Sequence, residues 1–339
     1  MKQTTRIQAI GAALGMLLLI LDGKTALSGA AEGLELCMKS VIPALFPFFV
    51  LSGMLTGSFS RQSVSLIRLF GALVGIPSGS EVLLLTGLVG GYPVGARCVG
   101  QATRSGSLSP EDSRRMMAFC NNAGPSFIFG IAAGLFPDAW YGWLLWTIQI
   151  ISAVTVGALL PGKSHNEVLV TSGRAIGITD ALAQAIRSIA TVCGWVILFR
   201  IVLAFLNRWL FWVFPAEFHI LLFGIFELTN GCLALNGISN MGLRFLLAAG
   251  FLSFGGLCVA MQTFSEGKGM DMSWYFPGKC LQTAVSLWLA ALIQHLFPAG
   301  LRMNIPLPIL AAPVLIALPV MIFCRIREKS SSIPGKAIV

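Results

Sequence analysis

The chain has 339 residues, of which 56% are hydrophobic and only 11% are charged. Soluble domains are about 45–50% apolar and about 25% charged, so this composition excludes an ordinary soluble domain and indicates a polytopic membrane protein. The net charge of +9 does not indicate a nucleic-acid partner, because the basic residues fall in short loops between apolar segments, as in the cytoplasmic loops of membrane proteins.

Apolar segments that match membrane spans follow one another along the chain. A spanning helix needs about 20 mostly apolar residues. The candidate segments are 7–21, 36–59, 114–136, 141–160, 188–213, 243–264, 280–297 and 306–324. The first resembles a secretory signal, but no convincing small-residue cleavage site follows it, so we expect a retained first helix.

Two further apolar pieces, 82–100 and 218–238, carry Gly and polar residues at their tips. The loop with Arg97, Arg104, Arg114 and Arg115 and the basic tail both fall on the cytoplasmic side if each piece enters the bilayer and returns to the same side, and in the second half Arg302 alone is then outside. Each half then contains a helix, a re-entrant piece, a broken helix and a helix, and the halves start from opposite sides. We therefore predict an all-α polytopic membrane protein with inverted-topology repeats, re-entrant hairpins and interrupted helices, as in many secondary transporters.

This topology predicts both termini in the cytoplasm and divides the chain into five parts. The parts are an N-terminal helix and connector (1–35), a first repeat (36–160), a cytoplasmic linker (161–187), a second repeat (188–325) and a basic cytoplasmic tail (326–339).

The centre of segment 114–136 holds its most polar and least helical residues. Gly124 and Pro125 are expected to interrupt the helix, because Pro lacks a backbone donor and Gly is flexible. Asn121, Asn122 and Ser126 offer hydrogen-bonding groups at a depth where broken backbone needs protein or a water-filled cavity. They predict a binding site for a polar solute, although the same residue types also join helices in membranes.

The other two pieces carry matching features. Tyr92 and Pro93 lie in a Gly-rich turn that we expect to join two half-helices, the alternative being an exposed loop between two ordinary spans. Glu227 lies at a depth where an acid usually faces a cavity or a partner, and Arg200 is the candidate partner in either a structural pair or an ion-coupling role. The predicted substrate-binding residues are Tyr92, Pro93, Asn121, Asn122, Gly124, Pro125, Ser126, Glu227, Thr229 and Asn230.

Metal and catalytic motifs are not evident in the sequence. The eight Cys residues lie almost entirely within apolar segments without a CxxC pair, and the three His residues are scattered. We expect the Cys residues to be small buried hydrophobes, and we predict no metal site, no cofactor and no enzymatic activity.

Two motifs resemble a known family. GYPVGA at 91–96 and FCNNAGP at 119–125 resemble motifs of the sporulation integral membrane protein YlbJ family, in the nucleoside-recognition Gate group. This group is related to concentrative nucleoside transporters, spore maturation proteins and the membrane part of the ferrous iron transporter. The resemblance covers about 36 to 325 and implies a Gate-like fold, a role in spore formation and a transport activity.

We therefore expect a bacterial inner-membrane protein, associated with sporulation, with a midplane site for transport or recognition of a small polar solute, nucleoside-like or other. The alternative is a non-transporting scaffold that helps to assemble the spore envelope. The expected partners are the lipid bilayer and the solute, with a coupling ion and a homo-oligomer as further candidates, and no nucleic acid.

Overall fold

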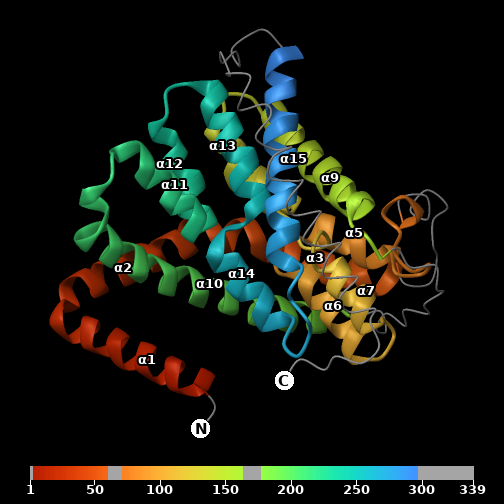
Figure 1. The fold of residues 1–339 in the computed structure, drawn as a ribbon, viewed down its shortest axis with the longest axis horizontal. Coiled ribbons are helices and arrows are strands. Elements are labelled where there is room, and N and C mark those ends of the chain that lie inside the picture. Colours follow the sequence, from red (N-terminus) through yellow and green to blue (C-terminus); the bar gives the residue numbers. More distant parts are fainter. Residues whose placement is uncertain (1–2, 60–70, 163–176, 297–339) are drawn as a thin grey trace.

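The computed structural model describes residues 3–59, 71–162 and 177–296. All secondary-structure elements that the structure assigns within these residues are helices (Figure 1). The stretches that are long and apolar enough to cross a membrane are Gly23–Leu51, Trp140–Leu159, Ile178–Trp209, Met241–Glu266 and Tyr275–Leu296. The prediction of an all-α protein with several membrane spans is therefore confirmed, and predicted segment 306–324 and the tail 326–339 lie outside the described residues.

The N-terminal part is more helical than the sequence indicated. Helix α1 (Gln3–Leu21) is followed by α2 (Gly23–Leu36), which continues through a wide π-helical turn (Cys37–Val41) into α3 (Ile42–Phe59). Asp22 starts α2 by accepting a hydrogen bond from the backbone N–H of Thr25. The expected connector before residue 36 is thus part of an apolar span.

Helix α10 (Ile178–Trp209) lies along α2 and α3 (Figure 1). It begins at Ile178, well before the predicted start at 188, because Ala181 and Ala185 bury one face of its first turns. Gly29 and Gly33 of α2 allow the close approach, since a Cβ on Gly33 would lie 2.9 Å from the Cα of Ile197.

In the first half, α5 (Glu81–Gly90) and α6 (Val94–Arg104) fold back on each other around a turn at 91–93. Next comes a helix in pieces, namely α7 (Pro110–Met116), an unwound stretch, α8 (Pro125–Phe127) and short turns of π-helix (Ile128–Ala132) and 3-10 helix (Ala133–Leu135). The predicted interruption at Gly124 and Pro125 is confirmed. Helix α9 (Trp140–Leu159) completes this half.

The second half contains the same order of elements. After α10 and a short 3-10 turn (Phe211–Val213), α11 (Ala216–Phe226) and α12 (Leu228–Ala234) fold against each other, and a 3-10 turn (Leu235–Gly237) follows. Helices α13 (Met241–Phe254) and α14 (Gly256–Glu266) form a second broken helix. Helix α15 (Tyr275–Leu296) then packs against α9 and α13 (Figure 1).

Candidate functional site

In the first half, the α5–α6 hairpin contacts the unwound stretch between α7 and α8 through its backbone. A Cβ on Gly87 would lie 1.7 Å from the carbonyl oxygen of Cys120, and a Cβ on Gly124 would lie 2.7 Å from the Cα of Gly91. Real Cβ atoms do not approach so closely, so only Gly allows α5 and the turn after it to touch the unwound stretch before α8.

Gly residues also allow a close backbone approach in the second half. Gly255 and Gly256 have φ values of 80° and 79°, a left-handed conformation that favours Gly, and they separate α13 from α14. A Cβ on Gly256 would lie 3.1 Å from the carbonyl oxygen of Gly224, and one on Gly231 would lie 2.2 Å from the Cα of Gly224. The break in the α11–α12 pair therefore lies against the break in the α13–α14 helix.

Tyr92 joins the two halves at these breaks. It follows Gly91 and precedes a cis peptide bond to Pro93. Its hydroxyl donates a 2.9 Å hydrogen bond to the carbonyl oxygen of Leu252, in the last turn of α13. The turn of the first hairpin therefore contacts the end of the second broken helix.

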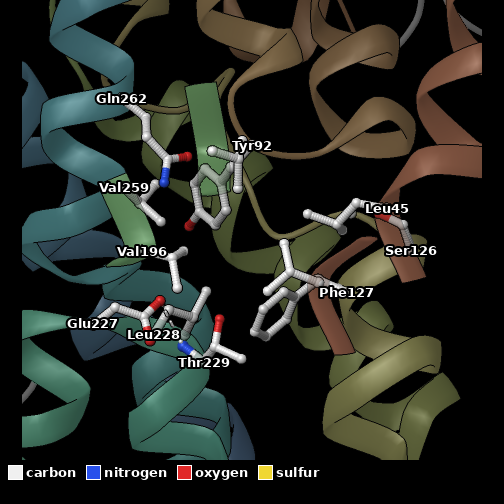
Figure 2. Close-up of a pocket in the computed structure, with 13 residues that line it drawn as sticks. Leu45, Tyr92, Ser126, Phe127, Val196, Glu227, Leu228, Thr229, Val259 and Gln262 are labelled. Atoms are coloured by element: carbon white, nitrogen blue, oxygen red, sulfur yellow. Dashed lines mark hydrogen bonds between the residues drawn. The ribbon is translucent and has the colours of Figure 1, made fainter. Parts of the chain in front are cut away.

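A small cavity lies where the breaks meet (Figure 2). Its volume is about 30 Å³, enough for roughly one or two water molecules. Five predicted site residues line it, namely Tyr92, Gly124, Ser126, Glu227 and Thr229. Gln262 adds an amide, and Val and Leu side chains form the rest of the wall together with Phe127. The structure thus brings together residues of both halves that the sequence singled out separately.

Glu227 is buried at the start of α12. Its carboxylate accepts hydrogen bonds from the backbone N–H groups of Thr229 (3.0 Å) and Asn230 (2.7 Å), and from the side-chain amide of Asn230 (2.7 Å). A carboxylate at this position satisfies free N–H groups of the helix and is stabilised by its dipole. Glu227 is therefore held by the backbone of α12.

Glu227 does not pair with Arg200, the partner that the sequence suggested for it. Arg200 forms an ion pair with Glu32, because it lies on the face of α10 that packs against α2. The prediction of an Arg200–Glu227 pair is wrong.

Asn121 and Asn122 lie behind the cavity and are fully buried. The amide of Asn121 donates to the hydroxyl of Thr263 (2.7 Å), and its oxygen accepts from the N–H of Ala96 (3.3 Å). The amide of Asn122 donates to the carbonyl of Phe119 (2.7 Å). These hydrogen bonds hold the unwound stretch in place and do not face the cavity. Pro93, Pro125 and Asn230 also do not line the cavity.

The sequence reasoning missed Lys279, a fully buried residue near the start of α15. Its ammonium donates to the carbonyl oxygen of Asn121, and to side-chain oxygens of Gln282 (2.8 Å) and Asn122 (3.4 Å). The predicted span 280–297 begins one residue after Lys279. The signal was the spacing of Lys279, Gln282 and Ser286, which places three polar residues on one face of an apolar helix.

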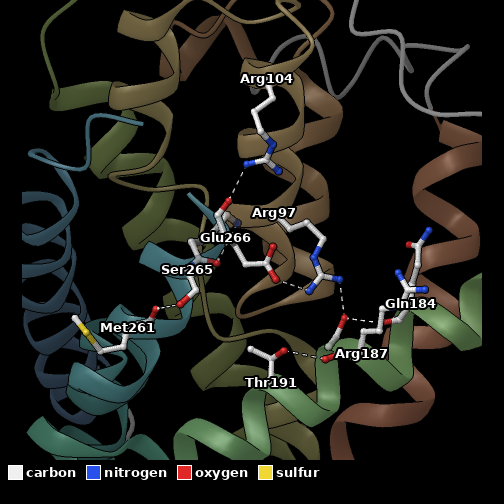
Figure 3. Close-up of polar contacts among 11 residues, drawn as sticks. Arg97, Arg104, Gln184, Arg187, Thr191, Met261, Ser265 and Glu266 are labelled. Atoms are coloured by element: carbon white, nitrogen blue, oxygen red, sulfur yellow. Dashed lines mark hydrogen bonds and ion pairs between the residues drawn. The ribbon is translucent and has the colours of Figure 1, made fainter. Parts of the chain in front are cut away.

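A polar clamp lies one helical turn from the cavity (Figure 3). The guanidinium of Arg97 on α6 donates to the hydroxyl of Ser188 on α10 (2.6 Å) and to the carboxylate of Glu266 on α14 (2.7 Å). Ser188 and Glu266 are four residues from Val192 and Gln262, which line the cavity. The clamp therefore joins both halves beside the cavity.

Metal-binding side chains do not gather in the part of the chain that the structure describes. Within it, no group of three or more His, Cys, Asp or Glu residues could hold a metal ion. The polar groups of the cavity are one carboxylate, hydroxyls and an amide, which can exchange hydrogen bonds with a small polar molecule.

Comparison with known proteins confirms the resemblance seen in the sequence. No protein-family model matches the chain, and no solved structure matches it. At 25% identity over 68% of this chain and 67% of the relative, the protein is a distant homologue of the sporulation integral membrane protein YlbJ of Bacillus subtilis (strain 168).

Proposed function

We propose that this protein binds a small polar solute in the cavity between its interrupted helices and moves the solute across the bacterial inner membrane. This transport would support spore formation. The observation that carries the proposal is that Tyr92, Ser126, Glu227 and Thr229, from breaks in both halves, line one cavity. In secondary transporters, broken helices meet near the membrane midplane and form the substrate site there. The proposal involves binding and movement, without covalent chemistry.

The α5–α6 and α11–α12 pairs are, in this proposal, re-entrant hairpins of two inverted repeats. Contacts between the two halves of the chain agree with the membrane sides that the loop charges predict. Arg97 contacts Ser188 and Glu266, which are all on the predicted cytoplasmic side. Arg244 donates to the carbonyl oxygen of Leu135 (2.8 Å), and both lie on the predicted outer side. Both termini would then be cytoplasmic.

The cavity chemistry limits the class of solute. Glu227 accepts hydrogen bonds, the hydroxyls of Ser126 and Thr229 donate or accept them, and the ring of Tyr92 supplies an apolar face. A neutral or cationic molecule with several hydroxyl or amino groups fits this set, and a nucleoside is one example. At about 30 Å³ the cavity is far smaller than such a solute, so the two halves must separate to admit it.

The double variant Ser126→Ala, Thr229→Val tests the site, because it removes two cavity hydroxyls and hardly changes volume. We expect wild-type protein to be stabilised by its solute, by about 2.7 kcal/mol at a concentration of 100 Kd, in a thermal-shift screen of nucleosides and small polar metabolites. The variant should keep its solute-free Tm and lose about 2 kcal/mol of binding, roughly 30-fold in affinity.

The matched control is Thr155→Val, Ser265→Ala, whose hydroxyls bond the carbonyls of Ile151 and Met261 in their own helices. It should bind like wild type. Uptake into proteoliposomes then separates transport from binding alone. A wild-type protein that no solute stabilises, or a cavity variant with unchanged affinity, would contradict the proposal.

The link to sporulation is tested in a Bacillus subtilis strain that lacks the homologue. We expect wild-type protein to restore heat-resistant spores, and the cavity double variant to fail at equal abundance in the membrane. A scaffold needs only the folded protein, so restoration by the cavity variant would instead support the assembly role. Failure of the wild-type protein would remove the support that the homologue gives.

A further inference from the structure

Lys279 places a cation among polar groups deep in the protein. Its side chain is fully buried, and its nitrogen lies 5.4 Å from the ring centroid of Tyr92. Within the described residues, its hydrogen-bond partners are three oxygens, from the backbone of Asn121 and the side chains of Asn122 and Gln282. Ionisable residues at such depth are costly and usually serve a function.

The partners of Lys279 fit the charged form of the amine. An ammonium has three N–H donors and no acceptor, whereas a neutral amine has a lone pair that needs a donor. Three oxygen acceptors surround the nitrogen, and an aromatic face favours a cation. Among the described residues, no carboxylate oxygen lies within 4.0 Å of this nitrogen. The positive charge is therefore balanced by neutral dipoles.

The oxygens belong to a place that suits a free cation. The carbonyl of Asn121 is part of the unwound stretch between α7 and α8. In broken membrane helices, unwound carbonyls coordinate the coupling ion of the transporter. We propose that the ammonium of Lys279 is a built-in cation, occupying the site at the first helix break where Na⁺ or K⁺ would otherwise bind. This does not depend on whether the protein moves a solute.

Tyr92 lies between the built-in cation and the cavity and contacts both. The ring of Tyr92 faces the Lys279 nitrogen, and Tyr92 also lines the cavity. Because the charge is covalently attached, the first helix break stays closed without a free ion. The wild-type protein should therefore be equally stable in Na⁺, K⁺ or a cation too large for the site.

Two substitutions at Lys279 separate charge from space. Lys279→Ala removes the ammonium and leaves room for an ion, whereas Lys279→Met removes it and fills the room. In choline chloride we expect both to lower Tm by roughly 5–10 °C, because buried carbonyls lose their donors. At equal ionic strength, NaCl or KCl should restore part of the loss in the Ala variant, in a saturable way, and none in the Met variant.

Three results of this experiment would overturn the inference. One is a wild-type Tm that is higher in NaCl or KCl than in choline chloride. Another is an Ala variant that gains nothing from either salt. The third is equal gain in the Ala and Met variants, which would indicate a general effect of salt. Since the readout is solute-free stability, failure of the transport proposal leaves this test unchanged.

A second test keeps Lys279 in place, so it does not depend on recovery of the first two variants. Gln282→Glu puts a carboxylate on the oxygen position 2.8 Å from the ammonium. Gln149→Glu is the matched control, since Gln149 is also buried but bonds to the hydroxyl of Ser253. Gln282→Glu also loses the hydrogen bond that the Gln282 amide donates to Asn122 Oδ1 (2.8 Å). We therefore expect a small loss of Tm for Gln282→Glu and a clearly larger loss for Gln149→Glu, because only the former carboxylate is balanced by a cation. An equal loss in both would contradict a charged Lys279.

Discussion

At the scale of residues, Gly and capping side chains decide where the chain breaks and how closely the pieces approach. Ser109 accepts the N–H of Asp112 and Pro110 follows it, the pattern that commonly starts a helix. Glu227 does the same for α12 with a carboxylate. The positions with the least freedom are the Gly residues at backbone contacts, because no side chain fits there.

Gly87 gives a residue-scale prediction. Gly87→Ala should destabilise the protein by more than about 3 kcal/mol, since the new Cβ would lie 1.7 Å from the carbonyl of Cys120 and the backbone must move. Gly194→Ala is the control, because nothing lies within 4 Å of that position and Ala favours helix by roughly 0.5–1 kcal/mol. Thermal unfolding of both purified variants checks this, and equal Tm values would refute it.

At the scale of elements, polar contacts between helices join the two halves of the chain. Arg97 links α6 to α10 and α14, and Arg244 links α13 to the end of the first broken helix. Lys279 and Gln282 link α15 to the unwound stretch before α8. Hydrogen bonds of this kind stabilise helix packing where lipid provides no hydrophobic driving force.

The Arg97 clamp gives an element-scale prediction. Arg97→Ala should lower stability by about 1–3 kcal/mol, because charged hydrogen bonds to Ser188 and Glu266 are lost in a mostly buried place. Lys39→Ala breaks the exposed Lys39–Glu35 pair and should have little effect on stability, because solvent screens that pair. Chemical or thermal unfolding in detergent compares them. A cost for Arg97→Ala no larger than for Lys39→Ala would exclude a stabilising clamp.

At the scale of the whole molecule, two broken helices and two folded-back pairs place their breaks against one another. α9, α13 and α15 pack together, while α10 contacts α2, α3 and α14. The same order of elements in both halves gives each break a counterpart. In the proposed transport, movement of one half against the other opens the cavity, since the cavity lies on their shared boundary.

Reporter fusions test this topology. The proposal places Gly106, after α6, in the cytoplasm, and Gly237, after α12, outside. A fluorescent protein fused after Gly106 should therefore fluoresce, and alkaline phosphatase fused after Gly237 should be active. If the first pair made one net crossing, Gly106 would lie outside, and if only the second pair did, Gly237 would lie in the cytoplasm, so either result would exclude the re-entrant arrangement.

The sequence by itself determined the membrane class, the helical fold and the places where helices break. These follow from local properties, since apolar length selects spans, and the Gly124–Pro125 pair adds flexibility and removes a backbone donor, which favours a break there. Local pattern also led to errors. Ser78 and Glu81 have the spacing of a capping box, which would start a helix at Ser78. No such box forms, because α5 begins after Ser80, and the Glu81 carboxylate accepts the N–H of Gly79.

Only the tertiary structure decided which polar groups face the cavity and which bond to protein. Ser126 and Asn122 looked equivalent in the sequence, yet Ser126 lines the cavity while Asn122 bonds to Gln282, 160 residues away. The same holds for Lys279, whose partners come from the unwound stretch of the other half. A local pattern records how polar a residue is, but its partner is set by the packing of distant helices, and that packing exists only in the folded chain.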